Sequence, residues 1–149
     1  PVGAAIPKLE KRQAYATLCD AASVGDVRAV RRLLAEGVDA NAADEDGVTA
    51  LMSAAFAAKR NVVRLLLDAG ADPNVQDSSG LTALMNAVIA NGEMPSRAEH
   101  PVFVEIVVDL LAAGADPSLR DSDGYTAADN ARAAELPELA RLLDGAAAD

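Results

Sequence analysis

Two side chains in this chain of 149 residues could act as a nucleophile or a general base: Cys19 and His100, the sole cysteine and the sole histidine. One imidazole cannot build a zinc site based on histidines. A Ser-His-Asp arrangement would have to take its imidazole from His100, which lies in a segment between Pro95 and Pro101. The sequence therefore predicts no catalytic residue and no metal ligand.

The glycines recur at fixed distances, which indicates an internal repeat. Gly-Val-Asp at Gly37 returns as Gly-Ala-Asp at Gly70 and Gly114, first after 33 residues and then after 44, which is one period plus 11. A second motif, Asp-x-x-Gly-x-Thr, begins at Asp44, Asp77 and Asp121 and therefore recurs after the same 33 and 44 residues. Two markers with one period indicate a repeat array. Each glycine thus has a turn or a helix end to explain it, and no phosphate-binding loop or other cofactor site is predicted.

Each repeat contains the start and stop signals of two short helices. A threonine opens the first helix, where its hydroxyl can accept a hydrogen bond from a free backbone amide. A glycine follows the second helix, where it can adopt positive φ and end that helix. These residues are Thr49, Thr82 and Thr126 at the starts, and Gly37, Gly70 and Gly114 at the stops. Helices of about nine residues do not persist alone in water, so they must stack on their neighbours.

These motifs resemble the ankyrin repeat. The family signature Thr-Pro-Leu-His-x-Ala reads Thr49-Ala-Leu-Met-Ser-Ala54 and Thr82-Ala-Leu-Met-Asn-Ala87 here, and the ending Gly-Ala-Asp-Pro-Asn stands at Gly70 to Asn74. The resemblance covers residues 16–143 and implies an all-α solenoid of helix-turn-helix units joined by β-hairpin-like turns.

The repeat frame divides the chain into a flank and one domain. Residues 1–15 form the predicted N-terminal flank and residues 16–149 a single ankyrin-repeat domain. Its four units cover approximately 16–41, 42–74, 75–118 and 119–149. The first unit has no Asp-x-x-Gly turn before it, and Arg132 occupies a core position in the last. Both features are expected of capping units, whose outer faces meet solvent.

The 11 additional residues of the third unit fall between its two helices, at approximately residues 92–102. Long surface insertions add little closure entropy, so this one could be neutral. Loops on a rigid scaffold also carry recognition, and in that case Met94, Arg97 and His100 would supply contacts.

Three rows of side chains recur around the capping threonines. Positions four and seven residues after the threonine share one helix face and give Ser53 and Asn86 in a polar row and Phe56 and Ile89 in an apolar row. The position before the threonine gives the row Tyr15, Val48, Leu81 and Tyr125. The resemblance implies that all of them face a concave groove that binds a partner. The apolar members could instead pad the helix stack.

The net charge is −10, and many of the aspartates lie in the segments that join units. They could bond backbone amides in turns or form a negative rim for a basic partner. The acidic balance argues against binding nucleic acid. No apolar run reaches the length that spans a bilayer. One cysteine fits a reducing compartment, so the protein is expected in the cytoplasm, or in the periplasm or secreted if a leader was removed before Pro1.

The sequence thus predicts a non-enzymatic, monomeric module that binds a protein partner in its groove. The alternative is an inhibitor or immunity-type regulator that occludes an enzyme or toxin active site with the same surface. A third class, an enzyme that uses His100 or Cys19, is the one that mutation can test most directly. The excess of arginine over lysine, ten to three, indicates a bacterial source.

Overall fold

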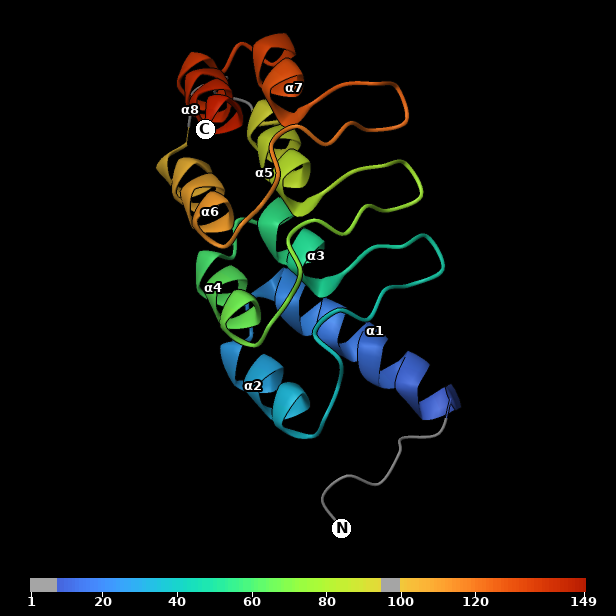
Figure 1. The fold of residues 1–149 in the computed structure, drawn as a ribbon. Coiled ribbons are helices and arrows are strands. Elements are labelled where there is room, and N and C mark those ends of the chain that lie inside the picture. Colours follow the sequence, from blue (N-terminus) through green and yellow to red (C-terminus); the bar gives the residue numbers. More distant parts are fainter. Residues whose placement is uncertain (1–7, 95–99) are drawn as a thin grey trace.

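The structure, a computed structural model, describes residues 8–94 and 100–149. In this part of the chain eight α-helices follow one another in pairs (Figure 1). The first helices of the pairs form one layer, and the second helices form a layer beside it. The first layer contains α1 (Lys8–Val24), α3 (Ala50–Phe56), α5 (Ala83–Gly92) and α7 (Ala127–Ala133). The second contains α2 (Val27–Ala35), α4 (Arg60–Asp68), α6 (Pro101–Ala112) and α8 (Pro137–Ala148). The prediction of an all-α repeat fold is confirmed.

The capping threonines and the terminating glycines act as predicted. The hydroxyls of Thr49, Thr82 and Thr126 each accept a hydrogen bond from the amide three residues on, at 3.3, 3.3 and 3.2 Å. Gly70 and Gly114, which follow α4 and α6, have φ of +89° and +92°. A residue with a Cβ adopts this conformation only at a cost, so these helix ends depend on glycine.

A continuous apolar core runs between the two layers. Leu51 and Leu84 are 1% exposed and Leu66 is fully buried. Alanines such as Ala54 and Ala87, also fully buried, let neighbouring helices approach closely. Because each helix pair buries its apolar side against the next pair, no pair has a separate core of its own.

Hairpin-shaped turns project from one side of the helix layers (Figure 1). Adjacent turns are hydrogen-bonded to each other: Ser78 donates its amide to the carbonyl of Asp46 at 2.7 Å, and Ser122 donates to Ser79 at 2.9 Å. Gly80 has φ of +76°, and a Cβ at this residue would lie 2.8 Å from the Cα of Asp121. Glycine is therefore needed here both for its conformation and for the close packing of the turns.

Two asparagines bond the loops between the helix pairs. Asn41 donates its side-chain amide to the carbonyl of Gly70 at 3.1 Å and accepts from the amide of Asp72 at 2.6 Å. Asn74 repeats both bonds with Gly114 and Asp116, at 3.0 and 2.7 Å. One side chain thus satisfies an acceptor and a donor of the neighbouring loop, which fixes the spacing of the pairs.

The first helix is longer than predicted. It begins at Lys8, inside the predicted flank, and has 17 residues where α3 has seven. Residues 8–16 contain lysine, glutamate, glutamine and alanine, which favour helix, and no glycine or proline follows Pro7 before α1 ends. Without a turn signal before Ala16, the helix extends toward its N-terminus and reaches the first hairpin turn.

The third helix pair is extended at the end away from the hairpin turns. α5 has 10 residues and α6 has 12, compared with seven in α3 and nine in α4. The two helices are joined by residues 93–100. Asn91, fully buried, accepts a hydrogen bond from the amide of His100 at 3.1 Å, which ties the start of α6 to the end of α5.

Candidate functional site

The candidate site is a surface made by repetition, which we call the inner-helix face. It consists of the exposed sides of α1, α3, α5 and α7 together with the residues that lead into the last three. The stacking of α1 on α3, α3 on α5 and α5 on α7 turns equivalent positions into rows that cross the array. The rows contain Val48, Leu81 and Tyr125; Asp20, Ser53, Asn86 and Asn130; and Phe56, Ile89 and Ala133.

The apolar members of this face are unequally exposed. Phe56 is 44% exposed and Tyr125 is 54% exposed, both high for large apolar side chains. Val48, Leu81 and Ile89 are half-buried and pack against the core. The half-buried residues pack in the helix stack and are also partly exposed to solvent. Phe56 and Tyr125 are more exposed than they are.

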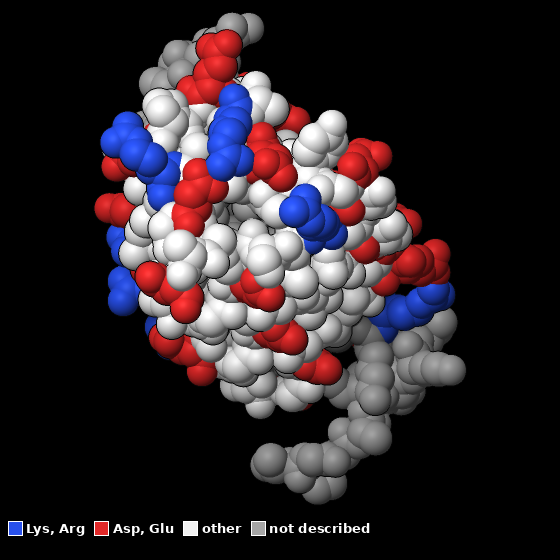
Figure 2. All heavy atoms as spheres, turned by 45° about the horizontal axis from the view of Figure 1, so that its top comes forward, with Lys and Arg blue, Asp and Glu red and all other residues white. Residues whose placement is uncertain are grey.

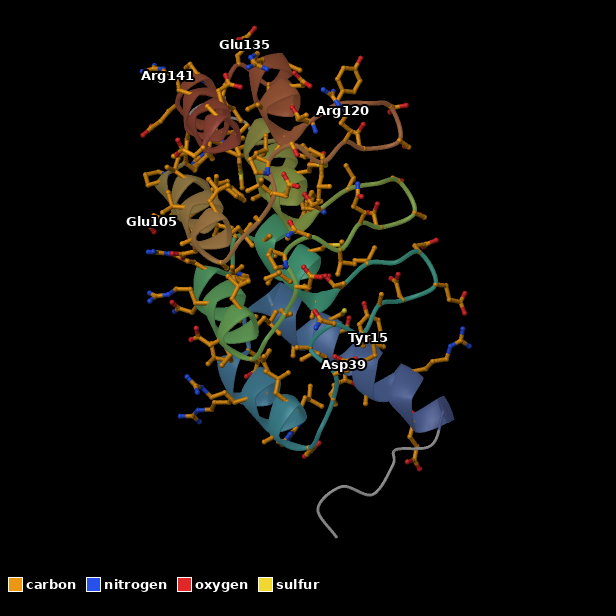
Figure 3. All side chains as sticks on the ribbon, viewed as in Figure 1. Tyr15, Asp39, Glu105, Arg120, Glu135 and Arg141 are labelled. Carbon is orange, nitrogen blue, oxygen red and sulfur yellow. The ribbon has the colours of Figure 1, made fainter. Side chains whose placement is uncertain are left out.

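Tyr15 does not belong to this face, and the prediction that it lies in the exposed row is wrong. The side chain is 8% exposed, and its hydroxyl donates to the carbonyl of Val48. The physical reason is the extension of α1, which places this residue against the first hairpin turn (Figure 3). Burial raises the pKa of Tyr15 above its usual value, so the hydroxyl remains a donor.

The polar row is half-buried in its central members. Asn86 donates its side-chain amide to the carbonyl of Thr82 at 2.9 Å, within its own helix. Ser53 lies one turn before Phe56 on the same side of α3. These short polar side chains form a strip beside the apolar row.

The aspartates of the hairpin turns divide into two classes. Asp44, Asp77 and Asp121 each accept two backbone amides of their own turn, at 2.8 to 3.0 Å. These three carboxylates therefore stabilise the turns, which is the structural role that the sequence analysis considered. Asp46 and Asp123 accept no side-chain hydrogen bond from any described residue, and sequence reasoning did not separate them from the others. The sequence could have separated them, because the middle turn has Ser79 at the equivalent position, which indicates that the turn does not require an acid there.

Two of the predicted residues of the insertion lie at the end of the third helix pair away from the hairpin turns (Figure 1). Met94 and His100 are half-buried at the end of α5 and the start of α6, and Arg97 lies outside the described residues. Leu81 precedes the other end of α5, whose 10 residues span about 15 Å. The structure therefore separates Met94 from Leu81, whereas Ile89, whose carbonyl accepts a hydrogen bond from the amide of Glu93 at 3.0 Å, lies at the same end of α5 as Met94.

The two reactive side chains lie apart from two hollows formed by the described residues. Cys19 is half-buried on α1, and burial raises the pKa of its thiol. Two hollows of about 260 and 540 Å³, at the start of α4 and beside α7 and α8, are lined by neither Cys19 nor His100. Among the described residues no three His, Cys, Asp or Glu side chains gather as metal ligands would, and no helix there has the length and hydropathy to span a bilayer.

Charges of opposite sign are distributed unevenly over the surface. Acidic side chains are spread over the whole face visible in Figure 2, and the basic ones stand in a few separate groups. In the second helix layer Arg60 bonds Asp109 at 2.7 Å and Glu105 at 2.8 Å, which links α4 to α6. The hydrogen bond that Arg60 donates to Asp109 holds the pKa of Arg60 above its usual value.

Comparison with known proteins agrees with the helix-turn-helix architecture. A family model described as ankyrin repeats, in three copies, matches residues 18–121. A comparison with curated protein sequences returned no match. Ankyrin repeats are generally protein–protein interaction modules and are typically not enzymes. With its capped helix pairs, its stacked hairpin turns and this match over most of its length, the chain belongs to the ankyrin repeat family.

Proposed function

We propose that this protein is a non-enzymatic, monomeric binding module that holds a partner protein against the inner-helix face. The observation that carries the proposal is the exposure of Phe56, 44%, beside Ile89 in the apolar row. Exposed aromatic residues surrounded by half-buried apolar ones are typical anchors of binding interfaces. The family membership supports the general role, and the exposure of Phe56 supports the location.

Site-specific photo-crosslinking in an extract of the source organism tests the location. A photoreactive residue at position 56 is compared with one at position 108, because Val108 on α6 is 45% exposed and thus matches Phe56 in accessibility. A defined partner that crosslinks at position 56 and not at position 108 supports the proposal. Equal crosslinking at both positions contradicts it.

The identified partner is then purified and its affinity is measured by calorimetry. Phe56→Ala and Leu81→Ala should each weaken binding by at least tenfold, about 1.4 kcal/mol, while Val108→Ala binds like the parent. Asp39→Asn, in a loop between helix pairs, should change mainly the salt dependence. If the apolar variants bind like the parent and deletion of residues 92–102 abolishes binding in a folded protein, the insertion is the recognition element.

The same partner separates the two forms of the proposal. If it is an enzyme or a toxin whose activity falls when it is bound, the protein is an inhibitor or immunity-type regulator. His100→Ala and Cys19→Ala should leave the function intact in either case. A loss by several orders of magnitude in a folded variant would instead indicate an enzyme.

A further inference from the structure

We propose that the segment bound by the inner-helix face is a cationic polypeptide that combines apolar side chains with lysine or arginine. This inference rests on the proposed function and adds the chemistry of the partner. It depends on which charged groups around the face already have partners within the protein and which do not.

The carboxylates required by the turns are not the basis of the inference. Asp44, Asp77 and Asp121 occupy the same position in each turn and bond two amides there. Their charge is explained by the local fold. The inference depends on acidic residues at positions where the fold does not require an acid.

Three carboxylates meet that condition. Asp46 and Asp123 stand at the turn position that Ser79 occupies in the middle turn. Asp20 stands on α1 in the row where the next helix has Ser53. None of the three carboxylates forms a hydrogen bond or an ion pair with any residue in 8–94 or 100–149.

The basic side chains described on the same helices and turns are all engaged. Arg12 pairs with Glu45, Arg120 bonds the carbonyl of Gly124 at 2.6 Å, and Arg132 bonds Asp144 at 2.6 Å. The arginines without an ion pair among described residues belong to the second helix layer, on α2, α4 and α8: Arg28, Arg31, Arg64 and Arg141. Figure 3 shows Arg141 on α8 and Arg120 beside the last hairpin turn.

The carboxylates of Asp20, Asp46 and Asp123 are therefore not paired within the described chain. These carboxylates attract a cationic segment and repel an anionic one. Such charge complementarity raises both the specificity of binding and the association rate. The exposed Phe56 adds an apolar requirement, because a purely polar ligand would leave its ring in water. A segment with both basic and apolar side chains can bind the carboxylates and Phe56 at the same time.

The probe for this proposal is a short synthetic peptide of lysine and leucine at helical spacing, labelled with a fluorophore. Its counterpart carries glutamate in place of every lysine. Fluorescence anisotropy gives the affinity of each peptide for the full chain at low and at physiological salt. The lysine peptide should bind, more weakly as salt rises, and the glutamate peptide should not bind at either salt concentration.

Two triple variants separate local from overall charge. Asp20→Asn with Asp46→Asn and Asp123→Asn removes the three carboxylates of the proposed site. Asp68→Asn with Glu135→Gln and Asp149→Asn removes three exposed acids elsewhere, on α4, before α8 and at the last residue. Both change the formal net charge from −10 to −10 + 3 = −7. The first should weaken the lysine peptide at least tenfold, about 1.4 kcal/mol, and the second should leave its affinity nearly unchanged.

Equal losses in the two triple variants, or binding of the glutamate peptide, would overturn the proposal. The proposed function fails separately, when no partner crosslinks preferentially at position 56. If a partner does crosslink there and binds the first triple variant as tightly as the parent, the inner-helix face is a binding site and the cationic partner is wrong.

Discussion

The hydroxyl of Tyr15 donates a hydrogen bond to the backbone carbonyl of Val48, which joins the first helix to the first hairpin turn across 33 positions of sequence. The same carbonyl also accepts from the amide of Asp44 at 3.1 Å. Arg12, one turn earlier on α1, pairs with Glu45 of the same turn. The extended helix thus covers a hairpin turn that has no other turn on that side among the described residues.

Removal of this hydroxyl should destabilise the protein. Tyr15→Phe leaves the ring in place and takes away the donor, which should lower the free energy of unfolding by about 0.5–1.5 kcal/mol. Tyr125→Phe is the control because Tyr125 is 54% exposed. Urea denaturation of both variants measures the difference, and equal midpoints would mean that the bond contributes nothing.

Truncation of the core should weaken the array as a whole. Leu66 on α4 is fully buried, so Leu66→Ala should cost about 2–5 kcal/mol. Arg64→Ala, at an exposed position of the same helix, should have little effect. Unfolding should remain a single transition when followed by circular dichroism. A midpoint like that of Arg64→Ala would contradict the assignment of the repeat frame.

Two glycines in helices should respond to alanine with opposite sign. A Cβ at Gly92 would lie 2.8 Å from the Cβ of Ala134, whereas one at Gly145 meets nothing within 4 Å. Gly92→Ala should therefore destabilise by about 1–3 kcal/mol through overpacking. Gly145→Ala should stabilise by up to about 1 kcal/mol through helix propensity. Thermal unfolding of the two variants gives the sign of each change in stability. Stabilisation by Gly92→Ala would show that α5 and α7 can separate at no cost.

Acid should remove part of the stability of the last helix pair. Hydrogen bonds from the amide and the hydroxyl of Thr126 hold the pKa of Asp129 below its usual value. A lowered folded-state pKa stabilises the protein above the unfolded value, about 3.9, and this contribution is lost as pH falls through the folded value. The destabilisation caused by Asp129→Asn should thus be complete at neutral pH and shrink below about pH 4. Melting curves across this range test it, and a constant difference would contradict it.

The thiol of Cys19 should react slowly. Burial raises its pKa, so the thiolate fraction at mildly alkaline pH is lower than in free cysteine. Alkylation by iodoacetamide, followed by mass spectrometry, should be slower in the folded protein than after unfolding in urea. Faster alkylation of the folded protein would reveal an activated nucleophile and favour the enzyme hypothesis.

The local signals of the repeat were sufficient to predict its helices. Thr82 and Gly70 act within a few residues of their own position, through a cap and a positive φ, so their effect can be read without knowledge of distant contacts. The start of α1 could not be inferred in this way. It depends on the absence of a turn signal and on contacts of Tyr15 and Arg12 with a hairpin turn far along the sequence.

The residues of the candidate site were harder to predict, for a related reason. A repeat frame places Tyr15 and Tyr125 in equivalent positions, yet one is 8% and the other 54% exposed. Equivalence holds only where the neighbours are also equivalent, and the two ends of an array have different neighbours. The aspartates show the same limit of sequence reasoning. Asp44 and Asp46 are two residues apart in one turn, yet only the carboxylate of Asp44 accepts backbone amides of that turn.

The length of α5 separates Met94 and His100 from Leu81, and this separation has an evolutionary consequence. Substitutions that accumulate around Met94 and His100 do not touch Leu81 at the other end of the helix. Selection can therefore act independently on Leu81 and on these two residues. Among homologues, positions 94 and 100 should accordingly vary at rates unrelated to that of position 81.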